Sequence, residues 1–69
     1  MERCKNVFEN RGYEVTWITE DTIHAESDFN TYGLRRTVNG DFYLYDVKKP
    51  YSGGLELASA EELGYYLDL

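Results

Sequence analysis

Apolar residues recur at helical spacing at the start of the chain. Cys4, Val7 and Phe8 lie at positions i, i+3 and i+4. This spacing predicts a helix over residues 2–11. Gly12 stands where a glycine in the left-handed conformation commonly ends a helix. Because a helix this short is not stable alone, we expect its apolar stripe to pack on the rest of the fold.

Two segments then alternate between apolar and polar residues. Tyr13, Val15 and Trp17 share one face of the first segment, and Ile23 and Ala25 share one face of the second. An alternation of period two predicts half-buried strands. The two strands are close in sequence, so we expect them to form a hairpin.

The loop of this first hairpin has two possible lengths. A three-residue loop, residues 19–21, pairs Trp17 with Ile23 and collects the apolar side chains on one face. A two-residue loop, residues 20–21, would pair Ile18 with Ile23 and leave Trp17 beside a histidine. We favour the three-residue loop, which makes Trp17 a core residue.

A second hairpin is predicted at Asn39 and Gly40. This dipeptide is typical of a type I′ turn, because both central positions of that turn need positive φ. It would join a strand over residues 32–38 to one over residues 41–47. With a two-residue loop, Leu34 lies near Tyr45, Arg36 near Tyr43 and Thr37 near Phe42.

Both faces of the second hairpin are partly apolar. We take the larger apolar set as the core face: Tyr32, Leu34, Val38, Tyr43, Tyr45 and Val47. Phe42 or Leu44 is then expected to lie in a second contact surface.

The last third of the chain contains a helix start signal. Pro50 ends the preceding strand, since proline cannot continue a ladder, and residues 55–57 offer a short additional strand. Ser59 and Glu62 form a capping box, and Ala60, Leu63 and Leu67 form the apolar stripe of the helix that follows. The whole chain, residues 1–69, is therefore predicted to be a single α+β domain: an N-terminal helix, an antiparallel sheet of about four strands, and a C-terminal helix.

The composition excludes several classes of function. The 69 residues carry seven Lys and Arg against thirteen Asp and Glu, a formal net charge of −6. Nucleic acid and anionic membranes bind basic patches, so we expect neither as a direct partner. No apolar run approaches the roughly 20 residues that cross a bilayer. We expect no signal peptide and a cytoplasmic protein.

Residues with catalytic or metal-binding chemistry are few. Cys4 and His24 are the only thiol and imidazole groups, whereas structural zinc takes about four such ligands. We therefore expect no metal and no other cofactor. Cys4 lies on an apolar stripe, where a thiol is usually inert, and His24 is expected on the solvent face. The glycine-containing loop at residues 52–54 lacks a phosphate-binding motif. We expect that the protein is not an enzyme.

Acidic residues are grouped along the chain rather than mixed with basic ones. Residues 13–34 contain five carboxylates and no Lys or Arg. The favoured register places Glu14 and Glu26 opposite each other on the solvent face, with Glu20 and Asp21 at the hairpin tip. A negative surface of this kind suits a partner protein with a basic surface. The predicted partner-binding carboxylates are Glu14, Glu20, Asp21, Glu26 and Asp28.

Aromatic residues make up 16% of the chain, more than a core of this size can bury. Tyrosine is favoured at interfaces, because it offers a large area with a polar end. Tyr51, Tyr65 and Tyr66 fall outside the predicted core stripes, and we add them to the predicted binding residues. Tyrosines interleaved with carboxylates, rather than with lysines, indicate a protein partner.

In size, layout and charge the chain resembles the small acidic anti-CRISPR proteins of phages and mobile elements. The resemblance lies in the first helix, the hairpin at Asn39 and Gly40, the helix from Ser59 and the acidic block from Glu14 to Asp28. It implies an inhibitor whose carboxylates stand in for the phosphates of DNA. Such an inhibitor occupies the basic surface with which a CRISPR effector holds nucleic acid.

Two other kinds of protein remain open on sequence grounds. One is a regulatory adaptor or antitoxin-like protein that binds one cellular protein without mimicking DNA. The other is a structural domain that forms a homodimer through its additional Tyr and Phe face. The sequence is compatible with a monomer or a homodimer. If the chain is encoded by a phage, the cytoplasm is that of the host cell.

Overall fold

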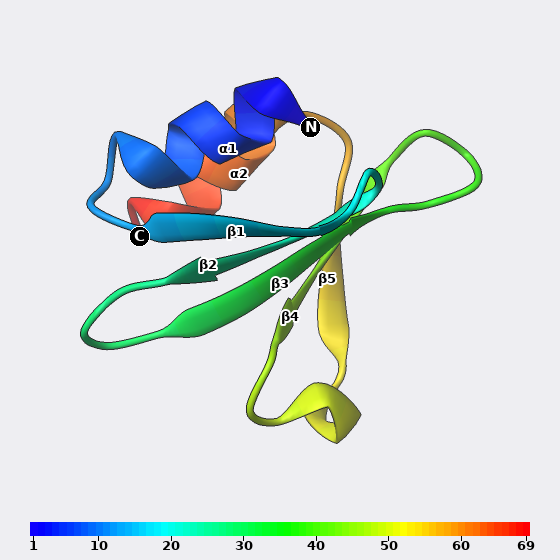
Figure 1. Ribbon diagram of the computed structural model, residues 1–69. Coiled ribbons are helices and arrows are strands. Elements are labelled where there is room, and N and C mark those ends of the chain that lie inside the picture. Colours follow the sequence, from blue (N-terminus) through cyan, green and yellow to red (C-terminus); the bar gives the residue numbers. More distant parts are fainter.

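The computed structural model describes residues 1–69 as an α+β fold. Two helices flank a five-stranded antiparallel sheet in the sequence, as Figure 1 shows. The predicted fold class is confirmed, and the short additional strand is present. The elements are α1 (Glu2–Glu9), β1 (Glu14–Thr19), β2 (Thr22–Glu26), β3 (Thr31–Arg36), β4 (Phe42–Asp46), a 3₁₀ turn η1 (Pro50–Ser52), β5 (Gly54–Leu57) and α2 (Ala60–Leu67).

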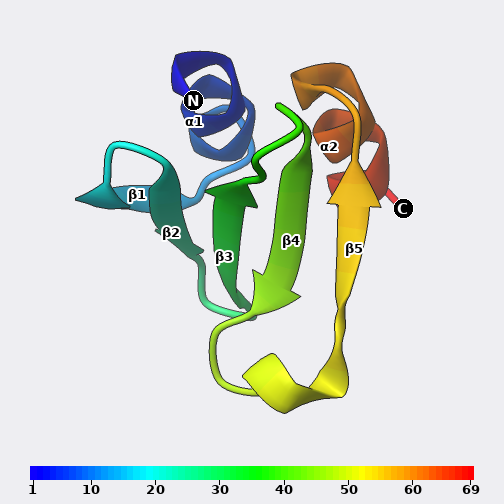
Figure 2. The ribbon, with the colours of Figure 1, turned by 90° about the vertical axis from the view of Figure 1, so that its right-hand side faces the viewer.

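The sheet is a simple meander. Its strands follow one another in chain order, each antiparallel to the next, so β1 and β5 form the two edges (Figure 2). Both helices lie on the same face, and η1 lies at the end of the molecule away from them (Figure 1). The other face of the sheet is left without a helix.

The first helix ends as its glycine predicts, but slightly earlier. α1 ends at Glu9, and Gly12 has a φ of +85°. The Tyr13 N–H donates to the Phe8 carbonyl and the Gly12 N–H donates to the Glu9 carbonyl, both at 3.1 Å. This pair of bonds is a Schellman motif. It turns the chain directly into β1.

The core lies between the two helices and one face of the sheet. Phe8 is fully buried at its centre, with the rings of Tyr13 and Tyr32 at 5.3 and 6.3 Å from its own. Burial raises the pKa of the Cys4 thiol, which keeps it protonated and unreactive. The nine buried core residues are Cys4, Phe8, Ile23, Ala25, Leu34, Leu44, Leu57, Ala60 and Leu63.

The favoured register of the first hairpin is confirmed. Trp17 pairs with Ile23, as a three-residue loop requires, but Thr19 also pairs with Thr22. These two pairings differ in register by one residue. The extra residue is Ile18, which forms a β-bulge and has no partner on β2. The tip is therefore tight, while the body of the hairpin keeps its apolar residues on one face.

The prediction that Trp17 is a core residue is wrong. Its side chain points to the core face, opposite Ile23, but it remains 41% exposed. The reason is its position on β1, which is an edge strand without a neighbour on its outer side.

The predicted register of the second hairpin is wrong by one residue. Leu34 pairs with Leu44. The Thr37 N–H donates to the Asp41 carbonyl at 2.8 Å, and the Gly40 N–H donates to the Thr37 carbonyl at 3.0 Å. These bonds close a three-residue loop. Only Gly40 in this loop has positive φ, at +88°, so the turn is not type I′.

This slip exchanges the two faces of the hairpin, because side chains alternate along a strand. Leu44 is 3% exposed and Phe42 packs against the core, so neither belongs to a second surface. Tyr43 and Tyr45 point to the opposite face, and Val38 is fully exposed in the loop. The predicted core set of this hairpin is therefore wrong, apart from Tyr32 and Leu34.

The C-terminal helix is capped as predicted. The Glu62 N–H donates to the Ser59 Oγ at 3.3 Å. The Glu62 carboxylate accepts from the Ala58 N–H at 2.8 Å, one residue before the position that a capping box uses. On the inner stripe of α2, Ala60 and Leu63 are buried and Leu67 packs against the core.

Candidate binding surface

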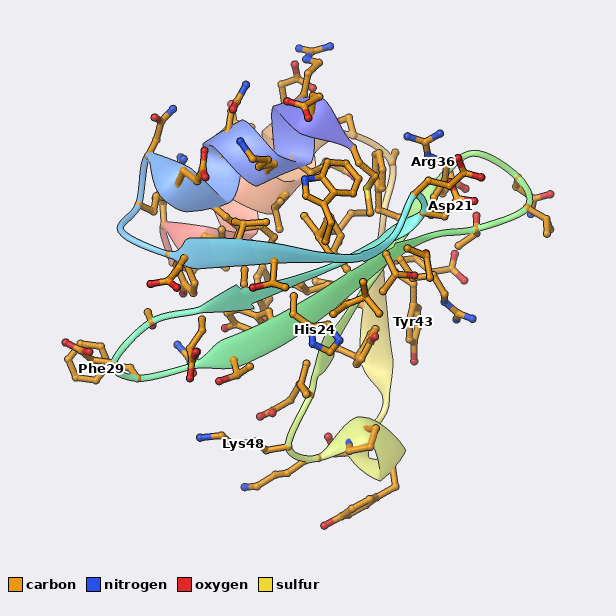
Figure 3. All side chains as sticks on the ribbon, in the orientation of Figure 1. Asp21, His24, Phe29, Arg36, Tyr43 and Lys48 are labelled. Atoms are coloured by element: carbon orange, nitrogen blue, oxygen red, sulfur yellow. The ribbon has the colours of Figure 1, made fainter.

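The face of the sheet that points away from the helices is called the open face below. Strand register assigns its residues, and Figure 3 shows His24 and Tyr43 on this side. Its members are Glu14, Thr16, Thr22, His24, Glu26, Thr31, Gly33, Arg35, Tyr43, Tyr45, Gly54 and Glu56. The face carries Tyr43 and Tyr45 on β4, Glu14 and Glu26 together at one end, and Glu56 on the edge strand β5.

Glu14, Glu26 and Asp28 form the acidic end of this surface. Glu14 lies directly opposite Glu26 across β1 and β2, and Asp28 follows in the loop to β3. All three are exposed, and they line one groove together with that loop and with Arg11. Every Lys or Arg that forms an ion pair does so with another carboxylate. None of the three carboxylates therefore has an ion-pair partner within the molecule.

The other two predicted carboxylates lie at the opposite end of the first hairpin. Glu20 and Asp21 are exposed at its tip, about 20 Å from Glu14 by strand geometry. Asp21 lies 3.8 Å from the guanidinium of Arg36 (Figure 3). The five carboxylates thus form two separate groups, and the tip group is partly neutralised.

Two arginines of the N-terminal segment are paired with carboxylates of the C-terminal segment. Arg11 donates to both carboxylate oxygens of Asp68, at 2.8 and 2.9 Å, and this bond holds the pKa of Asp68 below its usual range. Arg3 pairs with Glu61. The pKa of Glu61 is lowered by a hydrogen bond from its own backbone and by Arg3. These pairs connect the two ends of the chain, and neither involves a carboxylate of the acidic end.

Phe29 is an exposed apolar residue that the sequence analysis did not select. It is 91% exposed beside Asp28 and projects from the end of the molecule (Figure 3). The Ser27 Oγ accepts from the Phe29 and Asn30 N–H groups at 3.3 and 3.2 Å, which fixes the loop. A phenylalanine inside a Ser-Asp-Phe-Asn turn is the signal in the sequence, since turns of this composition are solvated.

The three predicted tyrosines do not form one patch. Tyr51 is 88% exposed on η1, and Tyr65 is exposed beside the groove between the helices. Tyr66 is only partly exposed, with its ring 6.4 Å from that of Tyr32. None of the three lies on the open face.

Two other tyrosines lie side by side on the open face, and we call Tyr43 and Tyr45 the tyrosine platform. Their ring centroids are 6.0 Å apart and the rings are stacked. A Cβ on Gly33 would lie 2.3 Å from the Tyr45 ring, and a Cβ on Gly54 would lie 2.4 Å from the Tyr43 ring. Each ring therefore covers a glycine of the neighbouring strand. The Arg35 guanidinium lies 5.4 Å from the centre of the Tyr43 ring.

No three His, Cys, Asp or Glu side chains come close enough to hold a metal ion. Neither helix is long and apolar enough to cross a membrane. No family model, curated protein or solved structure matches the chain. The surface described above is therefore the basis for assigning a function.

Proposed function

We propose that this chain is a non-enzymatic inhibitor that binds a basic, nucleic-acid-binding surface on a bacterial defence complex of the CRISPR–Cas kind. The observation that carries the proposal is the pairing of Glu14 with Glu26, with Asp28 beside them and no cation bound to any of the three. Like charges directly opposite each other destabilise a free sheet. Binding to a basic surface removes that cost.

A surface that holds nucleic acid is basic by necessity, because it neutralises phosphates. Cross-strand neighbours have Cβ atoms about 5 Å apart, so the acidic end presents adjacent negative charges, as a phosphate backbone does. Phe29 stands at the border of these charges and is nearly fully exposed. It offers an apolar contact within a charged rim, an arrangement found in many protein interfaces. The proposal includes a cytoplasmic location, where such complexes act.

The experiment is a competition assay with guide-loaded CRISPR–Cas effector complexes and their target duplex DNA. Two double variants carry the same change in net charge: Glu14→Gln with Glu26→Gln, and Glu20→Gln with Asp21→Asn. All four positions are exposed, so both variants are expected to fold. The first tests the acidic end, and the second is the matched control at the hairpin tip.

The wild-type chain is expected to displace DNA from at least one effector, and raising the salt concentration should weaken the competition steeply. Neutralising the acidic end should weaken the competition more than neutralising the tip. If no effector in the panel loses DNA binding, the proposed target is wrong. If the two variants weaken competition equally, net charge alone explains the binding and the acidic end is not the contact site.

A further inference from the structure

We infer that the tyrosine platform takes an arginine side chain of the partner, with the guanidinium stacked on the outward face of Tyr45. The inference rests on the proposed function, since it requires a partner with a basic surface. It adds a specific recognition element to the general attraction between opposite charges.

The position of Tyr45 prepares it for stacking. Its ring leans from β4 over Gly33 on β3, where a Cβ would lie 2.3 and 2.5 Å from two ring atoms and 2.6 Å from the hydroxyl oxygen. One face of the ring is thereby held against the backbone. Tyr45 shares the open face with Tyr43, which neither helix covers, and it is half-buried, so part of the ring remains open to solvent.

The platform already carries one guanidinium. Arg35 lies over Tyr43 at 5.4 Å, within the range of a cation–π contact. Tyr45 is stacked beside Tyr43 and has no cation over its ring. The same chemistry is thus available at Tyr45 for a cation from outside the chain.

The surrounding charge selects the ligand. His24 pairs with Gly33, and Glu26 lies two residues further along β2 on the same face, without a bound cation. Two residues of a strand span about 7 Å, so a side chain stacked on Tyr45 lies near the Glu26 carboxylate. Arginine suits both contacts, because its planar guanidinium stacks on rings and donates paired hydrogen bonds to carboxylates. Lysine can place its charge over a ring, but it lacks the planar face and the paired donors.

The experiment compares poly-arginine and poly-lysine peptides of equal length, titrated into the labelled protein and followed by NMR. The reporter is the Gly33 amide, which lies under the Tyr45 ring. The variant is Tyr45→Leu, and the matched control is Tyr51→Leu, because Tyr51 is an exposed tyrosine on η1. Gly33→Ala is a second variant, which displaces the ring without removing it.

Wild-type protein and Tyr51→Leu are expected to bind the arginine peptide about two- to fivefold more tightly than the lysine peptide, because only the guanidinium stacks flat on the ring and donates paired hydrogen bonds. The arginine peptide should shift the Gly33 amide. Tyr45→Leu and Gly33→Ala should bind both peptides equally. Either variant alone suffices for the test if the other does not fold.

Three results would contradict the inference. Equal binding of the two peptides by the wild-type chain would refute the arginine site and leave the proposed function standing. Failure of both peptides to bind would overturn the proposed function as well. Binding of a single-stranded oligonucleotide with a shift at Gly33 would show that the ring stacks on bases instead.

Discussion

Replacement of Phe8 by alanine tests the described core most directly. The ring is fully buried between the helices and the sheet and contacts Tyr13 and Tyr32. Removing a buried phenylalanine costs about 3–5 kcal/mol. A 69-residue domain has a free energy of unfolding of roughly 3–10 kcal/mol. Phe8→Ala is therefore expected to remove at least about a third of the stability, and to unfold the protein if its stability lies at the lower end.

Trp17 provides the comparison, because it is larger than Phe8 but lies at the sheet edge. At 41% exposed, it buries little more than half of its surface, and solvent can fill the space that it leaves. Trp17→Ala is therefore expected to cost about 2 kcal/mol, roughly half the cost of a fully buried aromatic residue.

The assay is urea denaturation followed by far-ultraviolet circular dichroism, which does not depend on the tryptophan signal. The change in free energy follows from the shift in midpoint at constant slope. A cost for Trp17→Ala equal to or greater than that for Phe8→Ala would refute the described packing. It would mean that the tryptophan, not the phenylalanine, is the centre of the core.

Three further predictions concern the ends of the two helices. Ser59→Ala removes the cap of α2 and should lower the free energy of unfolding by about 1 kcal/mol in the same urea assay. Gly12→Ala meets open space but must hold a φ of +85°, so a thermal melt should show a loss of about 1–2 kcal/mol. Arg11 lowers the pKa of Asp68 in the folded state. The pair therefore stabilises the fold fully above about pH 4, the ordinary pKa of an aspartate, and this stabilisation is lost as the pH falls through the lowered pKa. Urea titrations at pH 5 and at about pH 2 should show that the free energy of unfolding falls less for Asp68→Asn than for wild type. An equal fall in the two proteins would contradict the prediction.

Much of the fold could be predicted because local signals agree with one another. The α1 stripe, Gly12 and the Ser59 cap each depend on residues within one turn of chain. The first hairpin offers only one register that gathers its apolar residues on one face, and this register is the one observed. In these elements the structure that the local sequence pattern predicts is also the one that buries the apolar side chains.

The second hairpin could not be assigned in this way. An Asn-Gly pair fits a two-residue turn, but it also fits a three-residue loop in which glycine alone has positive φ. Both faces of the hairpin are apolar, so burial did not discriminate between the two. Leu34 pairs with Leu44 on one side and with Ile23 of β2 on the other. The observed register thus aligns three buried side chains in one row across the sheet. That row joins three strands and is not visible in the hairpin sequence alone.

The same slip explains what was missed in the candidate surface. The opposition of Glu14 and Glu26 follows from a register that could be predicted. The tyrosine platform could not, because the predicted register assigned Tyr43 and Tyr45 to the core. The tyrosines selected in their place were those outside any apolar stripe, and they lie on separate parts of the surface.

Tyr45 has a structural role that must be separated from its proposed role in binding. Glycine within a strand weakens it, because it has no side chain to pack, and the Tyr45 ring fills that gap over Gly33. A covering role needs only an apolar group of suitable size, which leucine supplies in part. Stacking on a guanidinium needs the π face of an aromatic ring. Tyr45→Phe should therefore keep both the stability and the preference for arginine, whereas Tyr45→Leu should lose the preference even where the sheet stays folded.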